Sequence, residues 1–480
     1  MNRPSLDEAR SKIIATIGPA CDSPQMLAKL VDHGVDIFRI NAAHGSQPYF
    51  AELLRRIEEV RQMTGFPVGV LLDLSGPKIR LGQLFQDPLE VEPGAELEFV
   101  RGEEPQAPTE LTSNYPKLVD EVRPGDRIML ADGTISLEVI ACAADRVRCR
   151  VLTGGVIRSR QGINLPGVAL SVSAMRPEDL DNAIWAAQNG IDFVSLSFVR
   201  SPQDVTSLKD LLRSLDCQAL VIAKIEKREA LERLEEIVDA ADGVMVARGD
   251  LGVEIDVAET PIAQKRIIQV CRDKLKPVIV ATQMLESMHE NSRPTRAEAS
   301  DVANAILDGA DACMLSGETA IGKYPIAAVD TMNRIMRYTE RLLKDQPVAP
   351  LPKEVKRVHP ITSAVTYNSS NIAQAIGAKL VVVASRTGGT AWVKSKQRNY
   401  IPTLGVSNDW AILRRMCLFW GIMPHYMESL DDPQQLIREV VHWGKTHSLL
   451  APGDNIVVVA GTGVMAKTHN LVVVHQVQPD

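Results

Sequence analysis

Two stretches of the sequence decide the fold. Residues 219–226 read Ala-Leu-Val-Ile-Ala-Lys-Ile-Glu, and residues 243–250 read Gly-Val-Met-Val-Ala-Arg-Gly-Asp. Each is a short, β-branched apolar run that ends in charged side chains, and a stretch with helical periodicity follows it. A strand without polar alternation is typical of a parallel sheet that is covered on both faces. These stretches therefore predict neighbouring strand–helix units of an α/β fold.

The same rhythm recurs along the chain. The helical stretch 48–63 carries one apolar stripe, with Ser46 placed to cap it and Gly65 placed to end it. Eight strand–helix units predict a closed parallel (βα)8 barrel, the TIM barrel. The eight apolar runs are residues 13–16, 35–41, 68–73, 192–198, 219–226, 243–248, 277–282 and 312–316.

The interval between the third and fourth runs is too long for a barrel loop. It contains three alternating segments, at 127–130, 135–139 and 146–151, separated by Gly-, Pro- and Asp-rich turns. This pattern predicts a small all-β domain inserted in the barrel. An insertion after a barrel strand faces the usual active-site end, so we expect it to serve as a lid.

The chain is therefore expected to divide into barrel, insert and a further domain. The linker-like stretch 349–352, Ala-Pro-Leu-Pro, precedes three more apolar runs that alternate with helical stretches. These predict a smaller C-terminal α/β domain, which we expect to be regulatory. The predicted segments are the first barrel segment at 1–75, the β lid at 76–160, the second barrel segment at 161–345 and the C-terminal domain at 353–480.

Composition excludes several classes of protein. Apolar residues make up 45% of the 480 residues and charged residues 24%, which is typical of globular domains. The net charge of −7 gives no bulk positive field for nucleic acid or an anionic membrane. No apolar stretch is long enough for a membrane span or a secretory signal, so we expect a cytoplasmic protein.

Polar side chains follow the apolar runs at their carboxyl ends. Because residues two apart on a strand share a face, we expect these side chains to meet in one cavity at the functional end of the barrel. Phosphoryl transfer needs such a set: oxygen ligands for Mg²⁺, fixed cations for the phosphoryl oxygens and a proton donor. The residues are Arg39, Asn41, Asp73, Lys224, Glu226, Arg248, Asp250, Thr282, Ser316 and Glu318.

Five motifs make the chain similar to a known family. They resemble the signatures of the pyruvate kinase family, and the resemblance extends from Ile13 to about Val477. That family's architecture, a barrel with a β lid and a C-terminal α/β domain, agrees with the apolar rhythm. The motifs are VIAKIEK at 221–227, MVARGDLGVE at 245–254, ATQMLESM at 281–288, RPTRAE at 293–298 and MLSGETA at 314–320.

The resemblance implies transfer of the phosphoryl group of phosphoenolpyruvate to ADP, which gives pyruvate and ATP in glycolysis. By this similarity Glu226 and Asp250 bind Mg²⁺, or Mn²⁺ in its place. Lys224 lies against the moving phosphoryl group, and Arg39 and Arg80 assist it.

The resemblance also assigns the two substrates to named positions. The peptide N–H groups of Gly249 and Asp250 hold the substrate carboxylate, and Thr282 belongs to the relay that protonates the enolate. The family is usually a homotetramer, so we expect the same here. The residues that border the nucleotide are Asn41, His44 and Pro19.

Two motifs depart from the family pattern, and both departures remove groups that the family uses at its monovalent-cation site. Residues 39–45 read RINAAHG, where relatives have Arg-x-Asn-Phe-Ser-His-Gly, and residues 73–78 read DLSGPK, where potassium-dependent members have Asp-Thr-x-Gly-Pro-Glu. Two hydroxyl groups are lost, and an acid is replaced by Lys78. We expect the Lys78 ammonium, with Asp73, to take the place of the monovalent cation. K⁺ is then not required.

A second phosphate site is predicted in the C-terminal domain. After the run 381–384, hydroxyls, glycines and peptide N–H groups at a helix start form a phosphate-binding nest, although an ordinary strand-to-helix turn has the same pattern. In relatives this loop binds an allosteric sugar phosphate or a nucleotide such as AMP, and residues 461–463 border its other side. The residues are Ser385, Arg386, Thr387, Gly388 and Thr390.

Two other functions fit parts of the sequence. A Mg²⁺-dependent phosphoenolpyruvate or pyruvate lyase or aldolase on a similar barrel shares the acidic metal pair, but it does not need Lys224, a lid or a second phosphate site. A catalytically impaired, pyruvate-kinase-like metabolite sensor is consistent with Ala42 and Ala43. It has no evident use for a retained proton relay.

Overall fold

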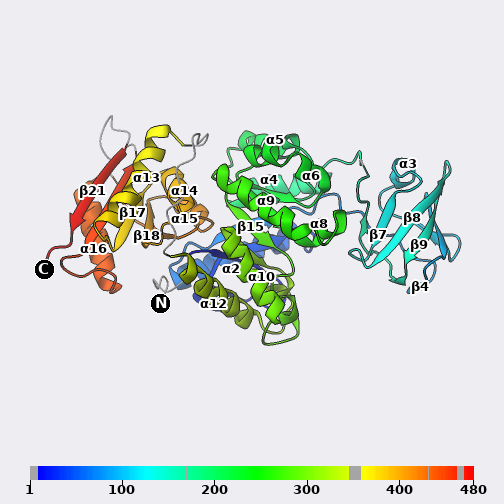
Figure 1. Ribbon diagram of the computed structural model, residues 1–480, viewed down its shortest axis with the longest axis horizontal. Coiled ribbons are helices and arrows are strands. Elements are labelled where there is room, and N and C mark those ends of the chain that lie inside the picture. Colours follow the sequence, from blue (N-terminus) through cyan, green and yellow to red (C-terminus); the bar gives the residue numbers. More distant parts are fainter. Residues whose placement is uncertain (1–8, 169, 345–357, 431, 462–469, 480) are drawn as a thin grey trace.

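The computed structural model describes residues 9–168, 170–344, 358–430, 432–461 and 470–479. Three units follow one another along the longest axis of the molecule (Figure 1). A closed barrel lies in the middle, a unit built mainly of strands lies on one side, and an α/β unit lies on the other. We call them the barrel, the β unit and the C-terminal unit.

The barrel is a closed ring of eight parallel strands in the order β1-β16-β15-β14-β13-β12-β3-β2. Most of their residues are buried, as expected for strands with helices outside and side chains inside. Each predicted run coincides with a strand to within two residues at either end, so the predicted (βα)8 barrel is confirmed. The strands are β1 (Lys12–Thr16), β2 (Val35–Asn41), β3 (Gly69–Asp73), β12 (Phe193–Leu196), β13 (Leu220–Ile225), β14 (Gly243–Ala247), β15 (Val278–Ala281) and β16 (Ala312–Leu315).

Helices cover the outside of the barrel. The predicted helix after β2 ends at Gly65, whose φ of 68° suits glycine, but the side chain of the N-cap residue Ser46 makes no capping hydrogen bond. The helical elements are α1 (Pro24–Asp32), α2 (Gln47–Thr64), α4 (Pro177–Gln188), α5 (Pro202–Ser214), α6 (Arg228–Glu232), α7 (Leu234–Ala240), α8 (Arg248–Glu254), α9 (Thr260–Asp273), the 3₁₀ helix η1 (Glu286–His289), α10 (Arg296–Asp308), α11 (Gly317–Ala320) and α12 (Pro325–Leu343).

The β unit leaves the barrel after β3 and returns before α4. Its main sheet has the order β11-β7-β8-β9-β5-β6, and β10 pairs with β4 beside it. Because β11 belongs to this sheet, the sheet continues past the boundary expected at residue 160. The elements are β4 (Leu89–Val91), β5 (Glu96–Val100), β6 (Glu110–Leu111), α3 (Leu118–Glu121), β7 (Arg127–Leu130), β8 (Ile135–Cys142), β9 (Arg146–Thr153), β10 (Gly155–Ile157) and β11 (Ile163–Asn164).

The C-terminal unit is a five-stranded sheet in the order β19-β18-β17-β20-β21, in which β21 runs antiparallel to β20. It confirms the predicted C-terminal α/β domain; β19 and β21 were not predicted, and the predicted linker 349–352 lies outside the described residues. The elements are α13 (Pro360–Ala375), β17 (Leu380–Ala384), α14 (Gly389–Lys396), β18 (Thr403–Ser407), α15 (Trp410–Met416), β19 (Ile422–Tyr426), α16 (Pro433–Thr446), β20 (Asn455–Gly461) and β21 (Asn470–Gln476).

The C-terminal unit closes the amino end of the barrel. Ile14 and Phe193 inside the barrel share one buried cluster with Trp392 and Leu413 of the C-terminal unit. Arg414 Nε donates to Asp192 Oδ1 at 2.8 Å across the same boundary. The carboxyl ends of the strands, on the side of the β unit, are therefore left for chemistry. Within the described residues, no helix is both long and apolar enough to cross a bilayer.

Candidate active site

A chain of alternating charges lies at the carboxyl ends of β2, β3 and β13. Arg39 Nε and Nη2 donate to Asp73 Oδ2 at 2.8 and 2.6 Å, and Arg39 Nη1 donates to Thr16 Oγ1 at 3.0 Å. Lys224 Nζ lies 3.4 Å from Asp73 Oδ1 and 2.9 Å from Glu226 Oε1. Arg39, Asp73, Lys224 and Glu226, which we call the Lys224 cluster, are thus brought together as the strand ends predicted.

Two serines complete this cluster, and the sequence reasoning missed them. Ser197 Oγ accepts from Lys224 Nζ at 2.8 Å, and Ser195 Oγ donates to Asp73 Oδ1 at 2.6 Å. Both serines are buried in the apolar run of β12. Their spacing of two along a strand was a usable signal, because two hydroxyls on one face of a buried strand need polar partners.

Paired charges favour the ionised forms of Asp73 and Lys224 despite burial. Burial by itself raises the pKa of the Asp73 carboxyl, but the positive charges of Lys224 and Arg39 outweigh it and lower that pKa. Burial by itself lowers the pKa of Lys224, but the negative charges of Asp73 and Glu226 raise it well above its usual value. The ammonium therefore stays charged at any physiological pH.

Glu226 and Asp250 have the chemistry of a divalent cation site. Burial raises the pKa of Glu226, Lys224 opposes that shift, and the negative charge of Asp250 adds to it. Glu226 Oε2 accepts from the peptide N–H of Phe198 at 2.7 Å, whereas Oε1 is buried and has no hydrogen-bond donor even though Lys224 Nζ is close. A buried carboxylate beside a second acid fits a hard cation such as Mg²⁺.

Thr282 sits in a strained turn at the end of β15. Its φ is 67°, which a β-branched residue rarely adopts, and such strain gathers at functional sites. Its Oγ1 donates to the carbonyl of Ala281 at 2.6 Å and accepts from the peptide N–H of Gly249 at 2.8 Å. Two groups with predicted substrate roles, the Thr282 hydroxyl and the Gly249 N–H, are therefore bonded to each other here.

Arg248 does not point into the Lys224 cluster, contrary to the expectation from its strand. Its Nη1 lies 2.6 Å from Asp301 Oδ2 of α10, and its Nη2 donates to the carbonyl of Thr282 at 2.8 Å. The guanidinium therefore stabilises the Thr282 turn through the backbone carbonyl of Thr282. Arg248 is the first residue of α8 and lies outside β14, so the alternation of strand side chains does not determine its direction.

Ser316 and Glu318 lie where β16 passes into α11. Glu318 accepts from the peptide N–H of Leu285 at 3.1 Å and from that of Ser316 at 2.7 Å. Both residues belong to the turn into α11, where the strand alternation used for the prediction has already ended. That these two residues share one cavity with the Lys224 cluster stays a prediction.

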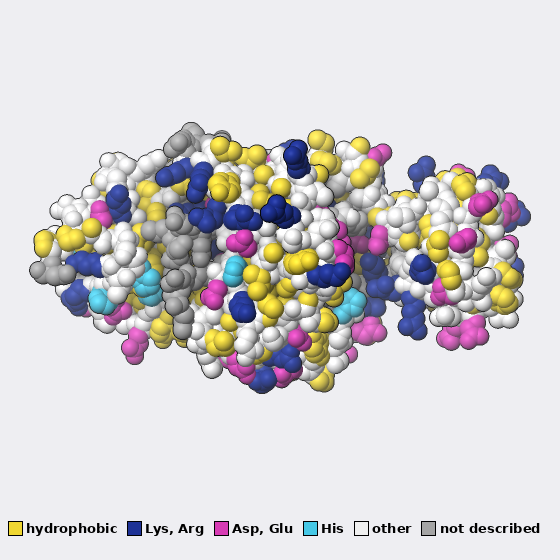
Figure 2. All heavy atoms as spheres, turned by 90° about the horizontal axis from the view of Figure 1, so that it is seen from below, with side chains coloured by type: hydrophobic (Ala, Val, Ile, Leu, Met, Phe, Trp, Pro, Cys, Tyr) yellow, Lys and Arg dark blue, Asp and Glu magenta, His cyan; other side chains and the backbone are white. Residues whose placement is uncertain are grey.

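The predicted nucleotide residues lie on loops at the same end of the barrel. Pro19 is exposed in the turn after β1, and His44 is exposed after β2. Asn41 closes β2, and its Oδ1 accepts from the peptide N–H of Ala43 at 3.1 Å. Charged side chains of both signs gather on the surface where the barrel meets the β unit (Figure 2).

Lys78 and Arg80 lie where the chain passes from the barrel to the β unit. Lys78 Nζ is 3.8 Å from Asp250 Oδ1, so its ammonium pairs with the predicted metal ligand, whereas the ion pairs of Asp73 are with Arg39 and Lys224. Arg80 Nη1 donates to the carbonyl of Arg160 at 3.4 Å, within the β unit.

The predicted phosphate loop forms the turn between β17 and α14. Ser385 Oγ accepts from the peptide N–H of Gly388 at 3.0 Å, and Gly388 has a φ of 80°. Arg386 and Thr387 are exposed, and Thr390 is buried. Thr387 and Gly388 border a cavity of about 560 Å³ between the barrel and the C-terminal unit. Residues 462 and 463, expected on the other side, lie outside the described residues.

The fold and the site together define an α/β-barrel enzyme of the phosphotransferase class. A family model described as the pyruvate kinase barrel domain matches residues 8–329, and one described as the pyruvate kinase alpha/beta domain matches residues 363–475. The chain belongs to the pyruvate kinase family.

Individual relatives agree with the family models over nearly the full length. The chain is 39% identical to a pyruvate kinase of Corynebacterium efficiens, covering 98% of this chain and 99% of that protein. A pyruvate kinase of Mycobacterium tuberculosis gives the same three values. A crystal structure of a pyruvate kinase from Cryptosporidium parvum has a TM-score of 0.90 at 31% identity, covering 98% of this chain and 96% of the other. The predicted family and enzyme are thereby confirmed, and neither the lyase nor the sensor is favoured.

Proposed function

We propose that the protein transfers the phosphoryl group of phosphoenolpyruvate to ADP, with Mg²⁺, or Mn²⁺ in its place, held at the barrel site. The observation that carries the proposal is the position of Lys224, whose ammonium lies between Asp73 and Glu226. A fixed, always charged cation beside an acidic metal site is what a migrating phosphoryl group requires.

The cations of the cluster stabilise the phosphoryl oxygens. Lys224 is oriented by Ser197 and by the two carboxylates, so it needs little reorganisation when charge builds up on the transferred group. Arg39 is fixed by Asp73 and Thr16 and presents its planar guanidinium to the same space. Arg80 belongs to the β-unit side, and we assign it to the phosphoryl group after the β unit closes.

Glu226 and Asp250 hold the divalent cation. Glu226 Oε1, which lies next to Lys224 Nζ, supplies one oxygen ligand, and the Asp250 carboxylate supplies another. When bound, the cation neutralises phosphate charge and polarises the enolate oxygen. Lys78 pairs with Asp250 at 3.8 Å and must move away as the ion is bound.

The Thr282 turn binds the substrate carboxylate and relays the proton to the enolate. Opening the Thr282 Oγ1–Gly249 N–H bond frees that N–H, together with the N–H of Asp250 at the start of α8, for the substrate carboxylate. The freed hydroxyl then relays a proton to the enolate through water, since a threonine hydroxyl is itself a weak acid. Asn41, His44 and Pro19 border the nucleotide on the adjoining loops.

We also propose that the enzyme does not require K⁺. Asp73, the acid expected near a monovalent cation, already pairs with Arg39 and Lys224, and Lys78 adds a further positive charge nearby. Turnover in potassium buffer and in tetramethylammonium buffer should be equal within about twofold. An activation by K⁺ of tenfold or more contradicts the proposal.

Regulation and assembly complete the proposal. The loop of Ser385, Arg386, Thr387, Gly388 and Thr390 binds the phosphate of a sugar phosphate or AMP, and the enzyme is a cytoplasmic homotetramer. Support for the loop is the glycine turn before α14 and the adjoining cavity. Calorimetry that detects neither glucose 6-phosphate nor AMP binding rejects the effector site.

One assay tests the catalytic proposal. Pyruvate formation is measured by coupling to lactate dehydrogenase, with phosphoenolpyruvate, ADP and Mg²⁺ present together and with each omitted in turn. We expect pyruvate only when all three are present, with one ATP formed per pyruvate. Pyruvate without ADP indicates a lyase or phosphatase, and no pyruvate at all indicates a sensor; either result overturns the proposal.

A further inference from the structure

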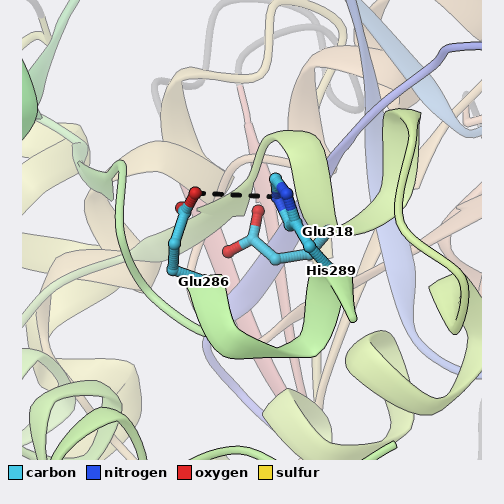
Figure 3. Close-up of side chains that lie close together, drawn as sticks. All are labelled: Glu286, His289 and Glu318. Carbon is cyan, nitrogen blue, oxygen red and sulfur yellow. Dashed lines mark ion pairs between the residues drawn. The ribbon is translucent and has the colours of Figure 1, made fainter. Parts of the chain in front are cut away.

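A second group of ligand-type side chains lies at the carboxyl ends of β15 and β16, outside the Lys224 cluster. Glu286 and His289 come from η1, and Glu318 comes from α11 (Figure 3). One ligand atom from each of the three lies within 4.8 Å of the other two. Two carboxylates and an imidazole therefore converge on one point, and we call this group the Glu286 cluster.

Local structure fixes the imidazole in this position. In a 3₁₀ helix, residues three apart eclipse one another, so Glu286 and His289 present their side chains on the same side. The Glu-x-x-His spacing is also the one that supplies paired ligands in carboxylate-bridged metal proteins. The His289 ring lies directly over Gly317, where an added Cβ would come within 2.1 Å of the ring. The carbonyl of His289 accepts from the peptide N–H of Lys323 at 2.9 Å.

The Glu286 cluster has negative charge without a matching cation. Glu318 is buried, and the hydrogen bonds to its two oxygens come from the peptide N–H groups of Leu285 and Ser316. His289 Nε2 is buried and has no hydrogen-bond partner, although it lies 3.9 Å from Glu286 Oε1. Among residues 9–344 and the other described segments, no lysine or arginine forms an ion pair with Glu286 or Glu318. A cation is what the cluster lacks.

We propose that Glu286, His289 and Glu318 bind one divalent ion of the zinc class, with water as a fourth ligand. Zn²⁺ takes imidazole nitrogen and carboxylate oxygen at about 2.0–2.2 Å in a tetrahedron, which sets neighbouring ligand atoms about 3.4 Å apart. The observed 3.9 Å between Glu286 Oε1 and His289 Nε2 needs only a small inward rotation to reach that value. A nitrogen ligand selects against Mg²⁺, which prefers oxygen ligands in an octahedron.

The ion links two loops of the barrel. Glu286 and His289 follow β15 on the loop that begins with Thr282, and Glu318 follows β16. Bound Zn²⁺ therefore fastens the end of the Thr282 loop to α11. This site is distinct from the Mg²⁺ site, because neither Glu226 nor Asp250 belongs to it.

Calorimetry of the full chain with ZnCl₂, in a buffer with excess Mg²⁺ to occupy the oxygen-only site, tests the proposal. We expect one Zn²⁺ per chain, and we expect His289→Ala and Glu286→Gln to weaken it by about tenfold or more. The matched controls are Glu290→Gln, which removes a carboxylate of the same loop that pairs with Lys323, and His442→Ala, which removes an exposed imidazole of α16. Both controls should bind Zn²⁺ like the parent protein.

Two further measurements keep the test decisive if a ligand variant folds poorly. Gly317→Ala retains all three ligands but displaces the His289 ring, so it should weaken Zn²⁺ binding by a similar factor. Co²⁺ in place of Zn²⁺ should give the strong visible absorption of a tetrahedral site in the parent protein. The proposal is overturned if the parent protein binds no Zn²⁺, or if His289→Ala and Gly317→Ala leave both the affinity and the Co²⁺ spectrum unchanged.

Discussion

Lys224, whose side chain is 12% exposed, and the buried Lys394 have surroundings with opposite effects on the pKa. Lys224 lies between Asp73 and Glu226, and these carboxylates raise its pKa although burial alone would lower it. Lys394 of α14 donates to Ser370 Oγ, and burial lowers its pKa to about 7. In the described part of the chain, no carboxylate pairs with Lys394. Neighbouring acids thus keep the Lys224 ammonium charged, at the place where we propose that the phosphoryl group binds.

Replacing Lys224 should have the largest effect. Lys224→Met removes the cation next to the transferred group, and we expect kcat in the coupled assay to fall by about 10³-fold or more. The same change leaves Asp73 and Glu226 with fewer positive partners, so the free energy of unfolding should also fall, by about 3 kcal/mol. Circular dichroism at the assay temperature establishes that the variant is still folded.

Lys394→Met is the matched control, since it removes a buried lysine that lies outside the barrel. Its kcat should stay within about twofold of the parent value, because Lys394 lies in the C-terminal unit and touches none of the site residues. If both variants lose activity equally, the charge at position 224 has no special role.

The lowered pKa of Lys394 should make the stability of the protein depend on pH. Because the pKa of Lys394 is about 7 in the folded chain and 10.5 as its ordinary value, the unfolded chain binds more protons between these pH values. The free energy of unfolding should therefore rise from pH 7 towards pH 10.5, by an amount on the order of 5 kcal/mol from this group. Lys224 has a raised pKa in the folded chain, so it stays charged in both states until the pH approaches 10.5, and it adds no such slope below that.

Urea unfolding of the parent protein and of Lys394→Met at several pH values measures the contribution of Lys394 to the pH dependence of the free energy of unfolding. The difference between the two proteins should favour Lys394→Met below pH 7 and shrink as pH rises. Lys396, whose pKa burial lowers to about 8 despite its pairing with Asp311, is present in both proteins and cancels. A difference that does not change with pH shows that Lys394 is not a desolvated amine.

The smallest expected effect is at Ser197. Ser197→Ala removes one hydrogen bond to Lys224 but leaves both carboxylates in place, so the ammonium stays charged and is less well oriented. We expect kcat to fall by about tenfold or less, which corresponds to about 1 kcal/mol. Val205→Ala in α5, a buried change away from the site, is the control for a general loss of packing. A 10³-fold loss in Ser197→Ala means that the serine, and not the carboxylates, determines the state of Lys224.

The strands of the barrel were predictable because each is an unbroken apolar run. For the same reason Arg39, Asp73, Lys224 and Glu226 were predicted together: each is the last residue of a run or lies two residues before it, and the closed ring brings the strand ends to one place. The predicted boundary at residue 160 came too early because β11 is only two residues long and has no periodicity of its own.

Residues that act through turns could not be predicted in this way. Arg248, Thr282 and Glu318 follow the strands directly, but their side-chain directions depend on the first turn of α8, a positive φ and the start of α11. The proximity of His289 to Glu318 depends on how two loops lie against each other, and no local sequence pattern encodes that. Ser195 and Ser197 did carry a signal, since two hydroxyls alternate in a buried strand.

The proposed function depends on Glu226 and Asp250, which we expect to hold the divalent cation beside the Lys224 ammonium. Mn²⁺ binding, followed by electron paramagnetic resonance of the free ion, measures it directly in the parent protein, in Glu226→Gln and in Glu286→Gln. We expect one tight Mn²⁺ per chain, weakened by about 10-fold or more in Glu226→Gln and unchanged in Glu286→Gln. Unchanged Mn²⁺ affinity in a folded Glu226→Gln variant contradicts the claim.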